Sequence, residues 1–220
     1  TDANIKSFKD LEGKTIAAPF GSTTHYLLLQ ALKDEGIDPA SMKILDLRPA
    51  DIAAAWARGD IDAAWFWEPN LDKAVKRGGN IFMTSGIMEK RGYPTWDVGV
   101  VMNDFAEKYP EYVNKFVKAE CDGIDYWIKN PEKTAAIIAE ELSLSLDDAT
   151  RMMKGTEMVP CDKQLTAQYM GTTGKIGGFA DTLVKTSKFL VSEKRLPVQL
   201  TRTSYERFLD PSYLENVVGK

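Results

Sequence analysis

The sequence predicts an α/β protein in which a parallel β-sheet carries helices, followed by a mainly helical second half. Up to about residue 100, short apolar runs alternate with helical patterns across short loops. This order is typical of parallel strands joined by crossover helices. The chain has 220 residues, 44% of them hydrophobic, which is enough to bury a core in one large or two small domains.

The first predicted strand, residues 15–20, follows a helical turn with a capping-box spacing at Ser7 and Asp10 and a glycine stop at Gly13. Four more apolar runs are predicted as strands, at residues 42–47, 61–67, 81–84 and 97–102. Helical periodicity with proline starts and glycine stops predicts helices at residues 26–32, 50–58 and 70–76, and then at 104–129, 131–142, 145–154, 164–170 and 179–191.

In parallel sheets, ligands bind beyond the carboxyl ends of the strands. The first such end carries Gly21, Ser22, Thr23 and Thr24 directly before a helix. A helix start presents unpaired N–H groups and a partial positive charge, glycine allows close backbone approach, and hydroxyls add donors. The segment therefore predicts a corner for a sulfonate, phosphate, sulfate or carboxylate. The alternative is that Ser22 or Thr23 is only a helix N-cap.

His25 lies in the first turn of that helix. It could help to bind an anion if protonated, but a helix start lowers the pKa of an imidazole, so a packing or surface role is favoured. A phosphate would usually recruit arginine or lysine, and none occurs between Gly21 and Leu32. Arg48 is the nearest candidate along the chain.

Two tryptophans spaced by two, Trp65 and Trp67, share one face of the third predicted strand. Trp65 is expected in the core, whereas Trp67 lies nearer the strand end, where it could cover an aliphatic chain or face a cation. Glu68 and Asp97 each lie at the edge of an apolar run, where a buried charge needs a partner. They are the best candidates to bind an ammonium group.

Composition argues against several other classes of protein. The net charge of −4 and the pI of about 5.2 are unlike those of nucleic-acid-binding proteins. One histidine with Cys121 and Cys161 does not suit a zinc site, and the two cysteines could be a disulfide or two buried thiols. No G-x-S-x-G, Walker A or G-x-G-x-x-G motif occurs. We therefore expect no catalytic residues, no metal and no cofactor.

No run approaches the length of a membrane-spanning helix, and TDANIKSFKD at the N-terminus has no signal-peptide pattern. A mature or trimmed chain would look the same, so the compartment stays open on this ground.

Four stretches resemble one family: DLEGKTIAAPFGSTTHYLLLQAL, ILDLRPADIAAAW, RGDIDAAWFWEPNL and PTWDVGVVMNDFAEKYPE. They resemble the taurine-type solute-binding proteins of ABC transporters, which belong with alkanesulfonate and nitrate binders among the type II periplasmic binding proteins. The resemblance implies two α/β lobes that close on a ligand. Residues 1–98 would form the ligand-binding lobe two, and residues 99–220 a hinge strand and the helical part of lobe one. About a third of the family's chain precedes SFKDLEG, so the implied fold is incomplete.

The resemblance also implies a site and a role. The sulfonate would bind at Ser22, Thr23 and Thr24, with Gly21 and His25 in the same motif. The amino group of a ligand such as taurine would meet Asp97, with Glu68 as second choice. The implied protein is a component of an importer, either periplasmic or extracellular and associated with the membrane through the transporter. Its implied partner is a membrane permease, and it is not an enzyme.

Three alternatives stay open beside this interpretation. The first is an effector-binding domain of a transcription regulator. The second is an enzyme on the same fold that uses His25 with an aspartate or cysteine. The third is a binder of another small anion, namely an alkanesulfonate, sulfate or nitrate.

Overall fold

The computed structural model describes residues 5–219, and the chain divides into two compact units. The first unit comprises Thr1–Trp96 with Phe189–Pro197, and the second comprises Asp97–Lys188 with Val198–Lys220. Within the described residues, no helix is both long and apolar enough to cross a membrane.

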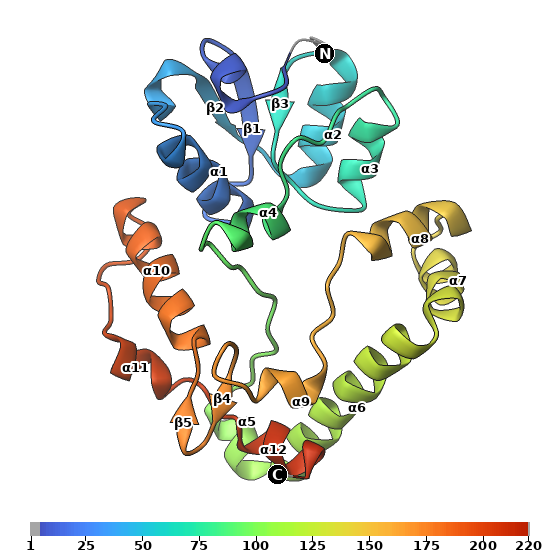
Figure 1. Cartoon of the computed structure of the whole chain (residues 1–220), viewed down its shortest axis with the longest axis vertical. Helices are drawn as coiled ribbons and strands as arrows, with labels where there is room; N and C mark the ends of the chain where they lie inside the picture. The colour runs from blue at the N-terminus through green and yellow to red at the C-terminus, as the bar shows by residue number, and fades with distance from the viewer. Residues whose placement is uncertain (1–4, 220) are drawn as a thin grey trace. The chain divides into compact units, whose positions relative to one another are not determined.

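The first unit is built on a three-stranded parallel sheet of order β2-β1-β3 (Figure 1). Its strands are β1 Thr15–Ala18, β2 Lys43–Asp46 and β3 Ala63–Ala64. In register, Ile16 of β1 lies opposite Ile44 of β2 and Ala63 of β3. The first three predicted strands are confirmed, although the third is shorter than its apolar run. The carboxyl ends of all three strands lie at one edge of the sheet.

Helices cover both faces of this sheet, with α1 on one side and α2 and α3 on the other (Figure 1). The helical elements of this part of the chain are η1 Phe8–Leu11, α1 Thr23–Asp34, η2 Pro39–Ser41, α2 Pro49–Arg58, α3 Asn70–Val75 and α4 Ser85–Lys90. The predicted capping box at Ser7 and Asp10 is present, and α2 starts at Pro49 and stops at Gly59 as predicted.

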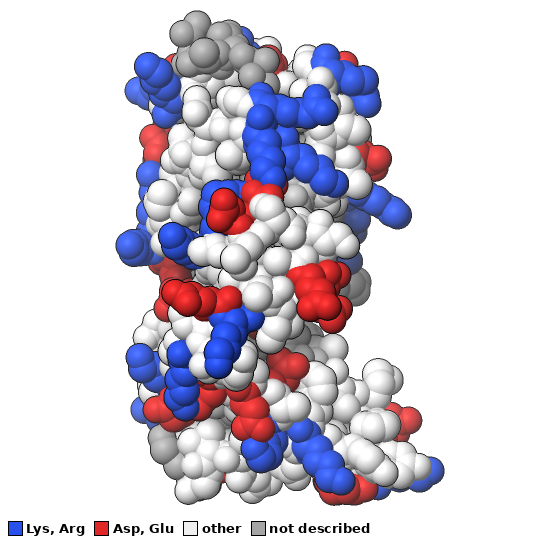
Figure 2. Space-filling model, turned by 90° about the vertical axis from the view of Figure 1, so that its right-hand side faces the viewer, with Lys and Arg blue, Asp and Glu red and all other residues white. Residues whose placement is uncertain are grey.

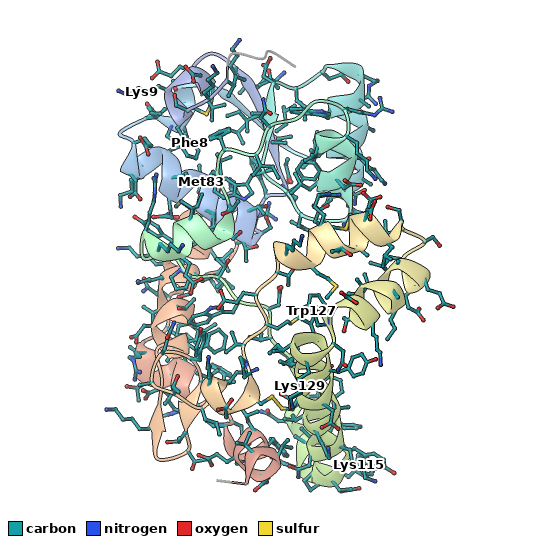
Figure 3. The ribbon with its side chains drawn as sticks, turned by 45° about the vertical axis from the view of Figure 1, so that its right-hand side comes forward. Phe8, Lys9, Met83, Lys115, Trp127 and Lys129 are labelled. Atoms are coloured by element: carbon teal, nitrogen blue, oxygen red, sulfur yellow. A yellow bond between two sulfur atoms is a disulfide. The ribbon has the colours of Figure 1, made fainter. Side chains whose placement is uncertain are left out.

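Side chains of β1 alternate between two apolar clusters, as the period of two in a strand requires. Ile16 and Ala18 pack with α1, whereas Ala17 packs with α2. Phe8 and Met83 belong to the α1 cluster, while the neighbouring Lys9 is exposed (Figure 3). Burial on both faces explains why β1 is a continuous apolar run rather than an alternating one.

Two predicted strands are wrong. Residues 81–83 have no regular structure, and Thr84 caps α4 by accepting a hydrogen bond from the N–H of Ile87 at 3.2 Å. Residues 97–102 also form no ladder with any described strand. Val100 in this segment is 91% exposed. A β-branched apolar run favours extended backbone, but a strand forms only where a neighbouring strand accepts its hydrogen bonds.

The second unit is largely helical. Its elements are α5 Asn103–Lys108, α6 Pro110–Lys129, α7 Pro131–Glu141, α8 Leu146–Lys154, α9 Cys161–Gln164, β4 Gly171–Thr172, β5 Lys175–Ile176, α10 Phe179–Ser192, α11 Arg202–Glu206 and α12 Ser212–Val218. The end of α10 belongs to the first unit.

Most helices predicted for the second half are confirmed, with two differences. Pro110 divides the predicted helix at 104–129 into α5 and α6, because proline starts a helix readily but interrupts one. The predicted helix at 164–170 is wrong. Helix α9 ends at Gln164, and turns then lead into the β4–β5 hairpin.

Cys121 of α6 and Cys161 of α9 form a disulfide with a Cα–Cα distance of 5.8 Å (Figure 3). This decides between the two states that the sequence left open. The bridge closes a loop that contains α7 and α8, which pack together around Ala135 and Ala149. Trp127, near the end of α6, packs against the same cluster.

Candidate functional site

The predicted anion corner lies at the carboxyl edge of the sheet, between β1 and α1. Gly21 has φ +78°, a left-handed conformation that glycine adopts without steric cost. This conformation turns the chain from β1 into the start of α1. Asp46 ends β2 at the same edge, and Trp67 and Glu68 follow β3.

Two hydroxyls hold this turn together. Ser22 is the N-cap of α1, and its Oγ accepts from the N–H of His25 at 3.3 Å. The same hydroxyl donates to the carbonyl of Pro19 at 2.5 Å and lies 2.8 Å from Oγ1 of Thr24. Because the Ser22 proton is used on Pro19, the buried Thr24 hydroxyl is the donor to Ser22. Ser22 is therefore the N-cap of α1.

Helix capping leaves two backbone donors of α1 unused. The N–H groups of Thr23 and Thr24 meet no acceptor among residues 5–219, and neither does the exposed Thr23 hydroxyl. They lie at the positive end of a helix of 12 residues. Three donors at one helix start are what an oxyanion needs.

His25 is buried beneath the anion corner, where it contacts Gly21 and Phe20. Its side chain is only 2% exposed, stacks on Phe20 with ring centroids 4.2 Å apart, and meets Phe189 edge-on at 5.4 Å. Its Nδ1 accepts from the N–H of Gly21 at 3.4 Å, which assigns a neutral ring protonated at Nε2. Burial lowers the pKa of His25, and the nearby Glu193 and Asp46 carboxylates oppose this only in part. The favoured packing role is what the structure shows.

Two charged residues at the corner were missed by the sequence analysis. Asp46 Oδ1 accepts from the N–H of Phe20 at 2.8 Å, and its Oδ2 lies 3.7 Å from Nη2 of Arg195. The Arg195 side chain lies over Gly21, with Nε 3.6 Å from the position that a Cβ would take there. Asp46 lies at the carboxyl end of a predicted strand, so the sequence could have indicated it as a site residue. Arg195 is far from Gly21 along the chain, and no local sequence pattern connects the two.

The two tryptophans follow β3, which ends at Ala64, so they do not share a strand face as predicted. Trp65 is half-buried against the core, and its backbone N–H donates to the carbonyl of Ala17 at 2.9 Å. Trp67 is 46% exposed. The carboxylate of Glu68 accepts from the N–H of Asp72 at 2.8 Å, in the first turn of α3.

Asp97 belongs to the other unit of the chain. It is the first residue of the second unit, and its side chain is exposed. The structure thus brings together Gly21–His25 by chain connectivity, adds Asp46 and Arg195, and places Trp67 and Glu68 after the adjacent strand.

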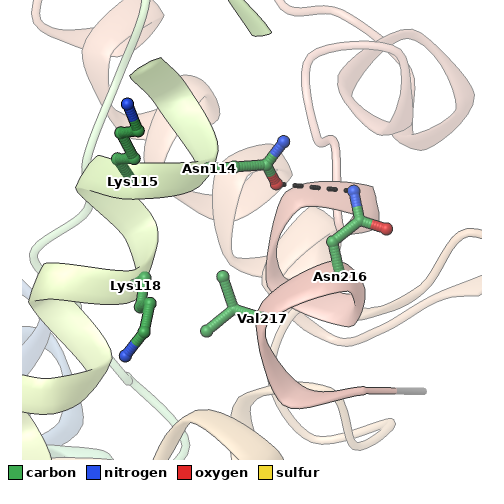
Figure 4. Close-up of a pocket in the computed structure, with 5 residues that line it drawn as sticks. All are labelled: Asn114, Lys115, Lys118, Asn216 and Val217. Atoms are coloured by element: carbon green, nitrogen blue, oxygen red, sulfur yellow. Dashed lines mark hydrogen bonds between the residues drawn. The ribbon is translucent and has the colours of Figure 1, made fainter. Parts of the chain in front are cut away.

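Two pockets are lined by residues of the second unit, none of which the sequence singled out. One lies between α6 and α12 and is lined by Asn114, Lys115, Lys118, Asn216 and Val217 (Figure 4). Most of its polar groups are already paired: Asn216 donates to Asn114, and Lys118 pairs with Asp122. Neither pocket matches a predicted site.

Charge is mixed over the surface. Basic and acidic side chains are interspersed over the face in Figure 2, as expected for a chain of net charge −4. Within residues 5–219, no three histidine, cysteine, aspartate or glutamate side chains gather where they could hold a metal ion.

Comparison with known proteins agrees with this fold. The fold is that of the SsuA-type periplasmic binding proteins. The periplasmic aliphatic sulphonate binding protein SsuA from Escherichia coli superposes with a TM-score of 0.73 at 20% identity, over 96% of this chain and 67% of that one. Residues 1–134 match the NMT1/THI5-like family model, and the chain belongs to that family.

The taurine-binding periplasmic protein of Escherichia coli (strain K12) is 36% identical over 219 residues. The match covers 96% of this chain but only 65% of that protein. The desulfurization enzyme DSZB shares the fold, with a TM-score of 0.63 at 16% identity over 99% of this chain and 74% of that one. The fold alone therefore does not separate a binding protein from an enzyme.

Proposed function

We propose that this chain is the ligand-binding part of a solute-binding protein of an ABC importer, and that it binds a small sulfonate such as taurine. The observation that carries the proposal is the pair of unused N–H donors of Thr23 and Thr24. They lie in a chain that is 36% identical to a taurine-binding protein. A sulfonate oxygen placed there completes the hydrogen bonding of the first turn of α1.

The remaining residues of the corner have distinct roles in this proposal. Gly21 and Ser22 shape the turn, and His25 supports it through the N–H of Gly21. Trp67, half-exposed after β3, covers the methylene groups of the ligand. A sulfonate carries one full negative charge at neutral pH, so the helix dipole stabilises it without any proton transfer.

The ammonium group of the ligand is assigned to Asp97, with Glu68 as second choice. Glu68 already accepts a hydrogen bond from Asp72, which supports Asp97 as the first choice. Asp97→Asn should weaken taurine at least tenfold but leave methanesulfonate, which has no amino group, unchanged. Glu68→Gln is the matched comparison, and unchanged taurine affinity in Asp97→Asn would contradict the assignment.

The role in transport is proposed from the similarity to the taurine-binding relative. The chain spans only 65% of the taurine-binding relative. In the proposal, residues 1–98 form one lobe, and residues 99–220 supply a hinge strand and the helices of the other. The ligand favours the closed form of the two lobes only to the extent that it binds this form more tightly than the open one. In the proposal, the closed form then docks on a membrane permease.

The proposed location is the periplasm. The taurine-binding relative and the SsuA protein that superposes on this chain are both named as periplasmic. The Cys121–Cys161 disulfide supports the same location, since such bonds persist in oxidising compartments and are rare in the cytosol.

A ligand panel tests the proposal. Thermal unfolding is measured with taurine, methanesulfonate, sulfate, nitrate and acetate at matched ionic strength. We expect the largest rise in unfolding temperature with sulfonates, because a ligand that binds only the folded state stabilises it. A preference for acetate over sulfonates would overturn the proposed ligand class. Recovery of taurine unchanged after incubation separates a binding protein from an enzyme.

A further inference from the structure

Arg195 reaches the anion corner because of the way helix α10 ends. The N–H of Arg195 donates to the carbonyl of Leu190 at 2.8 Å, and the N–H of Lys194 donates to that of Val191 at 3.0 Å. These two bonds, with Lys194 at φ +56°, form a Schellman cap. The cap reverses the chain direction and leaves Arg195 at the corner.

The guanidinium of Arg195 has few polar contacts within the described residues, so its donors stay available. Its Nε, Cζ and Cδ atoms lie 3.6–3.8 Å from the Cβ position of Gly21. No described residue accepts a hydrogen bond from this side chain, and its one ion pair is the 3.7 Å contact with Asp46. Both side chains of this pair are about half exposed.

Asp46 is fixed in turn, because its other carboxylate oxygen accepts from the N–H of Phe20 at 2.8 Å. The residue directly before Gly21 therefore anchors the carboxylate, and the guanidinium packs on Gly21 itself. One positive and one negative side chain flank the same helix start.

We infer that the Arg195–Asp46 pair sets the charge preference of the anion corner and selects singly charged oxyanions over doubly charged ones. The inference rests on the proposed function and deepens it. The guanidinium offers charge-assisted hydrogen bonds to any oxyanion at Gly21–Thr24. The Asp46 carboxylate offsets the positive charge of the guanidinium and repels any anion at the corner. This repulsion is about twice as large for the doubly charged sulfate as for a singly charged sulfonate, so Asp46 weakens sulfate binding more.

Calorimetric titration of the full chain at low ionic strength tests the inference, with methanesulfonate and sulfate as probes. Arg195→Gln should weaken both anions roughly tenfold. Asp46→Asn keeps the acceptor for Phe20 but removes the charge, so it should strengthen sulfate relative to methanesulfonate by roughly fivefold. Added salt should diminish both effects.

Matched controls come from exposed ion pairs of the first unit that lie outside the corner. Arg91→Gln removes a cation paired with Glu35, and Asp60→Asn removes an anion paired with Arg58. Circular dichroism of each variant verifies that it is folded.

The outcomes separate this inference from the proposed function. If sulfonate binding in Arg195→Gln equals that in Arg91→Gln, or if Asp46→Asn leaves the sulfate preference at the level of Asp60→Asn, the inference is overturned and the function stands. If the unsubstituted chain binds sulfate but no sulfonate, both the proposed ligand and the monoanion preference fail. If it binds neither anion, both proposals are wrong.

Discussion

At the scale of single residues, His25 makes the clearest prediction, because it is the one histidine of the chain. Burial lowers its pKa below the ordinary value of about 6.5, so the unfolded chain takes up the proton at a higher pH than the folded chain does. The contribution of His25 to stability should be full above about pH 6.5 and be lost as the pH falls through the folded-state pKa.

Nuclear magnetic resonance can follow the C–H signal of this single imidazole during a pH titration. We expect a midpoint below that of a histidine in an unstructured peptide. Urea unfolding at several pH values should show that the acid-induced loss of stability is smaller in His25→Gln. A midpoint at or above the peptide value would refute the neutral, buried ring.

Gly21 offers a second prediction at this scale. Gly21→Ala places a side chain at φ +78° and against Arg195, so we expect a loss of about 1 kcal/mol in the free energy of unfolding and weaker anion binding. Gly36→Ala is the matched control, because Gly36 has φ +70° with no atom near its Cβ position. It should cost similar stability without affecting anions. Equal anion affinities in the two variants would argue against a role of Gly21 in the site.

The residues of the site differ in how far sequence could predict them. Gly21 to His25 are consecutive, and the chemistry of a helix start depends only on local order, so the corner was predictable. Arg195 was not, because only the tertiary fold brings the end of α10 to Gly21. The sequence favoured a packing or surface role for His25 but did not identify Phe20 and Phe189 as the rings that it contacts.

At the scale of elements, the cap of α10 is testable. Lys194 adopts a left-handed conformation that disfavours side chains and favours glycine. Lys194→Gly should therefore raise the free energy of unfolding by roughly 0.5 kcal/mol, as relief of strain exceeds the entropy cost of glycine. Lys188→Gly, at an exposed position within α10, should instead lower it by about 1 kcal/mol. Loss of stability in both variants would contradict the cap.

Elements with strong local signals were predicted well, as α2 shows with proline at its start and glycine at its end. Residues 81–84 and 97–102 were wrongly predicted as strands because an apolar β-branched run does not specify a partner strand. The predicted helix at 164–170 failed for a related reason. Backbone carbonyls of Ala167, Gln168 and Tyr169 lie within 3.0 Å of Cβ positions at Gly177 and Gly178, a close approach that turns achieve with glycine.

At the scale of the whole molecule, the Cys121–Cys161 disulfide is a covalent cross-link within the second unit. It joins residues 40 apart and encloses α7 and α8. Reduction should lower the free energy of unfolding by about 3 kcal/mol. Thermal unfolding with and without reductant measures this, and the double variant Cys121→Ser/Cys161→Ser should not respond to reductant. Equal stability of the oxidised and reduced chains would show that the bridge constrains little.

The central claim is that the start of α1 binds a sulfonate through the N–H groups of Thr23 and Thr24. The most direct measurement is a taurine titration of the full chain, monitored through its backbone amide resonances. The account predicts that the Thr23 and Thr24 amide resonances shift most, and that their shifts give the same dissociation constant as calorimetry does. Saturable taurine binding that leaves both amides unmoved, or no binding at all, would contradict it.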